Sequence, residues 1–126
     1  MPIEIQWDDE AKTIIRENYL GQWTWDNFFA MSNQAAEMMQ TVDHRVDILA
    51  NMKDGIMPTS GASMSNSRKV LLALPSNWGV IVVVTNSFVS VLASIFKQFD
   101  VQLGTKMHTT DSLEKAYQII TTERAK

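Results

Sequence analysis

The sequence predicts an α/β fold built on a mixed, mostly parallel sheet. The strongest observation is the apolar, β-branched run from Val80 to Thr85, which has no polar face and, as a strand, must be covered on both sides. A second observation is that strand-like and helix-like segments alternate along most of the chain. The third is a pair of strand-like segments at the beginning, which indicates an antiparallel hairpin.

The opening hairpin and the first helix follow from two different periodicities. Ile3, Ile5 and Trp7 alternate with polar residues, an acidic turn follows, and a second β-rich stretch runs from Lys12 to Tyr19. After Gly21 the apolar residues recur at helical spacing. We expect Thr24 to be the N-cap of this helix and Trp23 to pack against Phe28. The helical positions are Trp25, Phe28, Phe29, Ser32, Ala35, Ala36, Met39 and Val42.

The middle of the chain is predicted to contain a short strand, a long loop and a second helix. The strand runs from Val46 to Met52, because its length and flanks argue against a helix. Periodicity disappears from Lys53 to Asn66, which is rich in Gly, Pro, Ser, Thr and Met. The second helix is expected to begin at about Ser67 and to stop before Pro75, with inward positions at Val70, Leu71 and Leu74.

The last third is predicted to add a helix, a weak strand and a final helix. Ser87 is the natural N-cap of an amphipathic helix from Phe88 to Phe99. Asp100 to Gly104 then links to a strand at about Lys106 to Thr109. Asp111 and Glu114 have capping-box spacing, and Leu113, Ala116, Tyr117 and Ile120 are expected to face the sheet. The predicted order is ββαβαβαβα, with about four helices.

Size and composition limit the class of protein. The 126 residues are 45% hydrophobic and 20% charged, which fits a single domain over residues 1–126. The net charge of -3 and the scattered Lys and Arg argue against nucleic acid as a partner. No apolar run is long enough for membrane insertion, and the first residues do not resemble a signal peptide. The absence of cysteine suits a reducing compartment, so we expect a cytoplasmic protein.

Residues that carry enzyme or metal chemistry are not arranged in recognisable patterns. His44 and His108 are the only histidines and have no ligand spacing, so we expect neither a metal site nor a cofactor. The acidic stretch Asp8-Asp9-Glu10 could hold a cation, but a hairpin turn selects the same residues. Serine and glycine form neither a nucleophile elbow nor a nucleotide-binding loop. We therefore do not expect an enzyme.

The chain resembles the STAS superfamily, and more closely its SpoIIAA-like branch of anti-sigma-factor antagonists. The likeness is carried by the element order, by the Tyr19-Leu20-Gly21-Gln22-Trp23-Thr24-Trp25 entry to the first helix, and by a glycine-containing loop after the strand that starts at Val46. It covers nearly the whole chain. It implies a STAS/SpoIIAA-like sandwich that acts in signalling by binding another protein, such as a kinase of the anti-sigma type or another regulator. A homodimer is also considered.

The same resemblance suggests a phosphorylation site in the loop from Lys53 to Asn66. Antagonists of the family carry an Asp-Ser-Ser/Thr-Gly signature there, and the best match is Pro58-Thr59-Ser60-Gly61, in which proline replaces the aspartate. This match implies Thr59 or Ser60 as the acceptor. Independently of the family, a phosphate beside a helix N-terminus is favoured by free N–H groups and the helix dipole. The alternative interpretation is that these residues are caps and turn formers.

The predicted contact surface combines this loop with flexible methionines, which suit adaptable interfaces but also fill cores. The first hypothesis is a non-enzymatic interaction domain. The alternative is a small-molecule domain, for a nucleotide or lipid-like ligand, with its pocket at the carboxyl ends of the strands and lined by Met52, Met57, Asn86, Ser87 and Phe88. The candidate partner-binding or ligand-binding residues are Met52, Met57, Pro58, Thr59, Ser60, Gly61, Met64, Asn86, Ser87 and Phe88.

Overall fold

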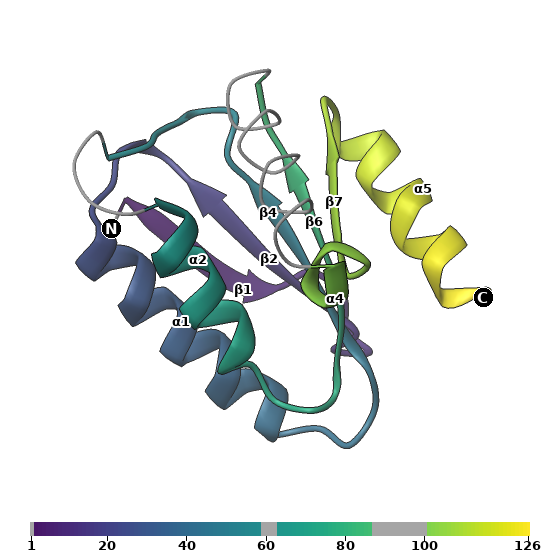
Figure 1. Cartoon of the computed structure of the whole chain (residues 1–126). Coiled ribbons are helices and arrows are strands. Elements are labelled where there is room, and N and C mark those ends of the chain that lie inside the picture. Colours follow the sequence, from purple (N-terminus) through teal and green to yellow (C-terminus); the bar gives the residue numbers. More distant parts are fainter. Residues whose placement is uncertain (1, 59–62, 87–100) are drawn as a thin grey trace.

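A five-stranded sheet forms the centre of the computed structural model, which describes residues 2–58, 63–86 and 101–126 (Figure 1). The strand order is β1-β2-β4-β6-β7. Only β1 is antiparallel to its neighbour, and all other pairs in this sheet are parallel. The predicted mixed, mostly parallel sheet is therefore confirmed. Its strands are β1 (Ile3–Trp7), β2 (Ile14–Tyr19), β4 (Val46–Asn51), β6 (Trp78–Val84) and β7 (Met107–Thr110).

Helices cover both faces of this sheet (Figure 1). The described helices are α1 (Trp25–Gln40), α2 (Ser63–Leu72), the four-residue α4 (Val101–Gly104) and α5 (Leu113–Arg124). About four helices were predicted, but the one expected at 88–99 lies outside the described residues. The short α4 occupies residues that were expected to form a link.

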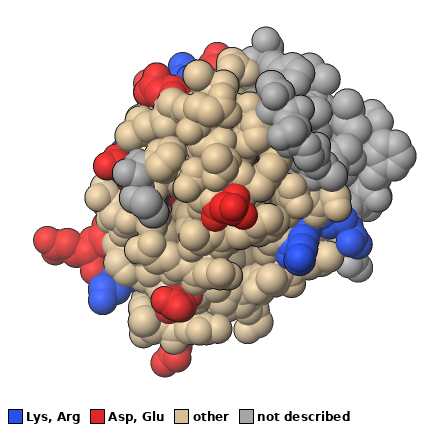
Figure 2. Space-filling model, turned by 90° about the vertical axis from the view of Figure 1, so that its left-hand side faces the viewer, with Lys and Arg blue, Asp and Glu red and all other residues tan. Residues whose placement is uncertain are grey.

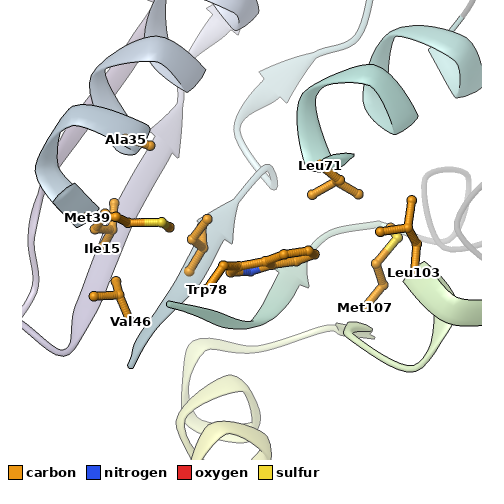
Figure 3. Packing of buried hydrophobic residues seen from close by; sticks show 9 residues of the cluster. Ile15, Ala35, Met39, Val46, Leu71, Trp78, Leu103 and Met107 are labelled. Carbon is orange, nitrogen blue, oxygen red and sulfur yellow. The ribbon is translucent and has the colours of Figure 1, made fainter. Parts of the chain in front are cut away.

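The core consists of two layers on opposite faces of the sheet. Ala35 and Met39 of α1 and Leu71 of α2 pack on one face, around the indole of Trp78 (Figure 3). On the other face, Ala116 and Ile120 of α5 pack against Leu49, Val80, Val82 and Val84. Strand β6 lies between β4 and β7 and is covered on both sides, as the apolar run predicted.

The entry to α1 has the predicted capping geometry. The Thr24 hydroxyl accepts a hydrogen bond from the Asn27 N–H at 3.1 Å, and the Asn27 side-chain oxygen accepts one from the Thr24 N–H at 3.0 Å. These reciprocal bonds satisfy backbone donors that a helix start leaves without partners. Trp23 packs against Phe28 with ring centroids 5.8 Å apart, which confirms the predicted contact. The buried Met31, Ala35 and Met39 continue the stripe that faces the sheet.

The described parts of the stretch from Lys53 to Asn66 are more ordered than the composition of this stretch predicted. Gly55–Ile56 forms a short strand, β5, which pairs in parallel with β3 (Gly21–Gln22). Helix α2 already includes Ser63, so the predicted start at about Ser67 is wrong. Ser and Asn lower helix propensity because they compete for backbone hydrogen bonds, and a two-residue strand has no periodicity to detect.

The final helix begins with a different cap from the predicted one. The Ser112 hydroxyl accepts a hydrogen bond from the Lys115 N–H at 3.2 Å, so Ser112 is the N-cap and the predicted Asp111 capping box is wrong. Asp111 instead pairs with the Lys115 ammonium at 3.0 Å. The inward face was predicted correctly, since Ala116 and Ile120 are buried and Leu113 and Tyr117 pack beside them.

Across the described ranges, none of the helices has the length and apolar character needed to cross a membrane.

Substitution of Val82 tests the two-sided burial of β6. Its side chain is 0% exposed, so Val82→Asp places an unpaired charge in the core and we expect it to abolish soluble folding. Val82→Thr is the matched control, since it keeps the shape and introduces only a hydroxyl, which costs about 1–3 kcal/mol. Soluble yield and thermal unfolding followed by circular dichroism distinguish the two variants. A soluble Val82→Asp protein with the melting temperature of the wild type would contradict the interior position.

Candidate functional site

The predicted site residues that the structure describes lie at the carboxyl end of the parallel strands. Met52 follows β4 directly, and its N–H donates to the carbonyl of Val84, the last residue of β6, at 2.8 Å. Met52 and Met57 pack against the buried cluster around Trp23, so both are partly core residues. Pro58 is half-buried and Asn86 is exposed.

The other predicted site residues cannot be placed in the same way. Thr59, Ser60, Gly61, Ser87 and Phe88 lie outside the described residues. Met64 belongs to the first turn of α2. The structure therefore brings Met52 and Met57 together around one cluster, and it tests neither the phosphorylation candidates nor the complete ligand pocket.

The β3–β5 ladder, in which β3 pairs with β5, fixes the residues after β4 beside the carboxyl end of the parallel strands. The Gly21 N–H donates to the Asp54 carbonyl at 2.8 Å, and the Gln22 side-chain amide donates to the Ile56 carbonyl at 3.3 Å. Gly55 lies so close to the core that an added Cβ would be 2.8 Å from the Tyr19 Cβ. The residues after β4 are therefore held against the sheet by backbone pairing and by a close approach that only glycine allows.

Two large apolar side chains are exposed here, one directly before β3 and one on β5. Leu20 is 42% exposed and Ile56 is 56% exposed, whereas Tyr19 and Trp23 beneath them are almost completely buried. Tyr19 and Trp23 pack edge to face with centroids 5.2 Å apart, which gives the ladder a rigid aromatic support. The sequence singled out the loop but not Leu20 or Ile56, because exposure of a single apolar residue cannot be read from an irregular stretch.

A carboxyl group is buried on the side of β2 that α1 covers. Glu17 is 3% exposed and lies between Ile5 of β1 and Ala50 of β4. Burial raises the pKa of Glu17 to about 8, and the hydrogen bond donated by the Tyr19 hydroxyl at 3.3 Å offsets part of this rise. Burial, together with the nearby Glu17, also raises the pKa of Tyr19. Glu17 is therefore mainly protonated at neutral pH.

The raised pKa of Glu17 predicts that stability falls as pH rises. The unfolded carboxyl loses its proton near pH 4.5, whereas the folded one keeps it until about pH 8. The free energy of unfolding should therefore fall between these values and level off above them, with a total loss on the order of 5 kcal/mol. Glu17→Gln is always neutral and should lack this loss. Urea unfolding between pH 5 and 9 measures it.

Glu4→Gln is the control, because Glu4 is an exposed glutamate on the neighbouring strand. It should keep the pH dependence of the wild type. Parallel stability curves for the wild type and Glu17→Gln would show that Glu17 ionises normally.

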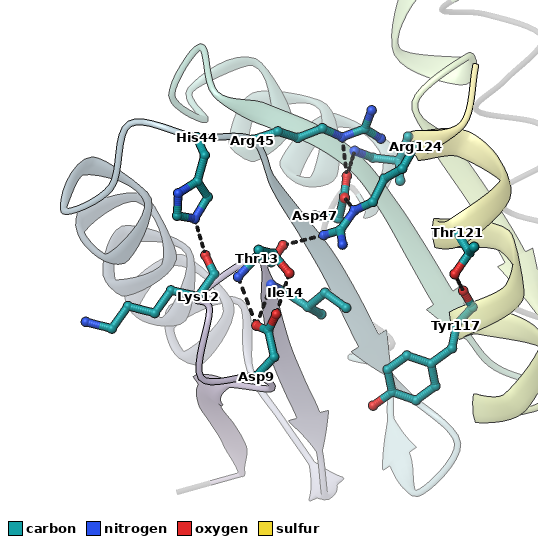
Figure 4. Close-up of polar contacts among 11 residues, drawn as sticks. Asp9, Lys12, Thr13, Ile14, His44, Arg45, Asp47, Tyr117, Thr121 and Arg124 are labelled. Atoms are coloured by element: carbon teal, nitrogen blue, oxygen red, sulfur yellow. Dashed lines mark hydrogen bonds and ion pairs between the residues drawn. The ribbon is translucent and has the colours of Figure 1, made fainter.

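A second polar cluster lies at the opposite, amino end of the parallel strands, around the fully buried Asp47 of β4 (Figure 4). One carboxylate oxygen accepts hydrogen bonds from the Val80 N–H at 2.8 Å and from Arg45 Nε at 3.0 Å. The other accepts one from Arg124 Nε of α5 at 2.6 Å. Asp47 thus joins β4, β6 and α5, and its charge is compensated by two guanidinium groups.

This cluster depends on a glycine at the start of β6. The pairing of β4 with β6 is irregular between Val46 and Ile48, and Gly79 lies opposite this irregularity. An added Cβ at Gly79 would be 2.2 Å from the Asp47 carboxylate and 2.1 Å from Arg45 Nε. Any side chain there would therefore displace the carboxylate or the guanidinium.

An open hollow of about 640 Å³ lies beside the same cluster. Its described lining includes Arg45 from the connection before β4, Trp78 and Gly79 of β6, Lys106 before β7 and Glu123 of α5. The Lys106 ammonium lies 4.5 Å from the centre of the Trp78 ring and donates to the Trp78 carbonyl at 3.2 Å. The Glu123 carboxylate pairs with His108 Nε2 and with the Lys126 ammonium, each at 3.1 Å.

The acidic turn after β1 forms a structural network. The Asp9 carboxylate accepts hydrogen bonds from the Thr13 N–H at 2.9 Å, from the Thr13 hydroxyl and from the Ile14 N–H at 3.1 Å (Figure 4). Burial raises the pKa of Asp9, but these bonds outweigh it and the pKa is lowered. Asp8 accepts from the Tyr117 hydroxyl at 2.9 Å. The residues therefore act as turn formers, as the alternative to a cation site predicted.

The histidines occupy structural positions in the described part of the chain. His44 is exposed, and its Nε2 lies 2.8 Å from the Lys12 carbonyl oxygen. His108 is half-buried on β7 beside Glu123. Among the described residues, no group of three or more His, Asp or Glu side chains is arranged to hold a metal ion.

Comparison with models of known protein families gave no match, and comparison with curated protein sequences gave none either. The STAS resemblance therefore rests on the sequence features that carry it and stays a prediction.

Proposed function

We propose that this protein is a non-enzymatic, STAS-like interaction domain that binds a regulatory protein through the β3–β5 ladder and the residues leading into α2. The observation that carries the proposal is the pair of exposed apolar side chains, Leu20 and Ile56, at a ladder held by the buried Trp23. Apolar side chains at the centre of a protein interface supply most of its binding energy when they are rigidly presented. The absence of cysteine suits a domain that acts in the cytoplasm.

The distribution of charge supports a protein partner over nucleic acid. The face shown in Figure 2 is mostly uncharged, and its few basic side chains form no continuous basic surface on the part that the structure describes. Binding to a phosphate backbone depends on a continuous basic surface. The net charge of -3 opposes such binding further.

Regulation of the same surface by phosphorylation is part of this proposal. Thr59 and Ser60 follow Ile56 within a few residues, and a phosphate there adds roughly two negative charges beside an apolar contact. Such a charge would have to be desolvated when the partner binds, so phosphorylation should weaken the complex.

A small-molecule site at the same end of the sheet is the second candidate. Thr85 is 3% exposed, and its hydroxyl has no hydrogen-bond partner in the described part of the chain. A buried hydroxyl is usually satisfied, and a ligand at the strand ends could accept or donate that bond. This candidate predicts binding of a small molecule to the isolated domain, without a protein partner.

Affinity capture from the source cells, with quantitative mass spectrometry, tests the main proposal. The baits are the wild type, Ile56→Asp and Gln118→Glu. Ile56→Asp places a charge at the centre of the proposed contact and should reduce partner recovery by tenfold or more, on the order of 2 kcal/mol. Gln118→Glu adds the same charge at an exposed position of α5, on the other face of the sheet, and should recover the partner normally.

Two further baits test the regulation separately. Thr59→Glu and Ser60→Glu should each weaken capture if that position is the acceptor, and phosphopeptide mapping of the native protein should find phosphate there. Equal recovery on the wild type and Ile56→Asp would refute the proposed surface. Loss on Ile56→Asp without any effect of the two glutamates would keep the surface and remove the switch.

A further inference from the structure

We propose that the hollow at the amino end of the parallel strands is a binding site for a small oxyanion, a phosphate or carboxylate group, held between the Arg45 guanidinium and the Lys106 ammonium. The inference is independent of the proposed protein contact, because that surface lies at the opposite end of the sheet. Its basis is a cavity of about 640 Å³ that carries both cations in its wall.

The ion pair with Asp47 orients the Arg45 guanidinium but uses only one of its nitrogens. Its Nε donates to the buried Asp47, while the side chain stays 41% exposed (Figure 4). Within the described residues its terminal nitrogens make no hydrogen bond that would compete with a ligand. A guanidinium anchored through Nε presents its remaining donors in a fixed plane, which is the geometry that binds oxyanions well.

Asp47 and its two arginine partners together carry a net positive charge, which also acts at longer range on Glu123. Asp47 carries one negative charge, and both Arg45 and Arg124 donate to it. Arg124 is used further, because its terminal nitrogen donates to the Thr13 carbonyl at 2.7 Å. Arg45 is therefore the member of the pair whose charge remains available toward the hollow.

Lys106 supplies the second cation from another element. Its ammonium stacks on Trp78 and donates to a carbonyl, and no carboxylate in the described part of the chain pairs with it. A lysine held over an indole keeps its charge and has a restricted position. The two cations therefore reach the same hollow from the connections before β4 and before β7.

The acidic residues that line the hollow do not cancel its preference for an anion. The hydrogen bond from Lys126, with the charges of His108, Lys126 and Arg45, lowers the pKa of Glu123, so this carboxylate is ionised and already compensated. Asp43 also lines the hollow but is exposed to solvent, where water and salt screen its charge. Among the described residues, no ion pair engages Lys106 or the terminal nitrogens of Arg45.

Titration followed by ¹H–¹⁵N NMR tests the site on the full chain. Sodium phosphate is one probe and sodium acetate the other, with ionic strength held constant by sodium chloride. The reporters are the Gly79 amide, the Arg45 Nε–H and the Trp78 indole N–H. At least one probe should shift all three along a saturable curve. Saturation by phosphate alone, acetate alone or both distinguishes the source of the oxyanion.

Three lysine variants separate binding from general charge effects. Lys106→Gln should weaken the affinity about tenfold, since a charge-assisted contact is lost. Lys106→Arg should restore it. Lys69→Gln is the matched control, because Lys69 also lies over an aromatic ring, 5.8 Å from the centre of Phe29, but outside this hollow. It should bind as the wild type does.

The spectra of the free variants establish that each is folded. Shifts that grow linearly with both probes, or an unchanged affinity in Lys106→Gln, would overturn the proposal. Equal weakening in Lys69→Gln would also overturn it, because it would assign the effect to net charge.

Discussion

The structure depends on the parallel pairing of β4 and β6, both of which are buried on both faces. Such strands cannot use solvent to satisfy their side chains, so helices must cover both sides of the sheet. Helices α1 and α2 cover one side and α5 the other. The crossover connections run from the carboxyl end of one parallel strand to the amino end of the next, so all parallel strands point the same way. The two ends of the sheet therefore differ chemically, because the connections leave the parallel strands at one end and enter them at the other.

The core accommodates two buried carboxyl groups, those of Asp47 and Glu17, in different ways. The Asp47 carboxyl group, at zero exposure, is compensated by three donors, one from β6 and two from arginines. Within the described residues, Glu17 accepts a hydrogen bond from the Tyr19 hydroxyl alone and keeps its proton instead. The two sites differ because Asp47 faces two guanidinium groups, whereas Glu17 faces one neutral hydroxyl, which leaves burial to raise the pKa of Glu17.

The two ends of the sheet are suited to different partners. At the carboxyl end, a ladder fixed by Gly55 and Trp23 presents apolar side chains outward, which favours contact with a protein surface. At the amino end, Gly79 leaves room for the Asp47 cluster, and the neighbouring hollow carries Arg45 and Lys106, which favours a small anion. The two proposed sites share no residues.

The sequence by itself determined the class of fold, the hairpin, the cap of α1 and the interior position of β6. Each depends on local information: an apolar run without a polar face, an alternating strand, or a threonine before a helical stripe. The same reasoning located the loop after β4 and named Met52 and Met57, which lie together in the structure. The early start of α2 and the cap of α5 were missed because Ser and Asn serve several local structures equally well.

Only the tertiary structure decided which polar residues meet. Asp47 and Glu17 are visible as acids within strand-like segments, a signal that could have marked them as unusual, but nothing local says that one has two arginines nearby and the other a tyrosine. Arg124 reaches Asp47 across 77 positions of sequence, and the exposed Ile56 lies on a strand that is defined by its pairing with Gly21 and Gln22. Such contacts depend on strand order and register, which are properties of the assembled sheet and not of any segment.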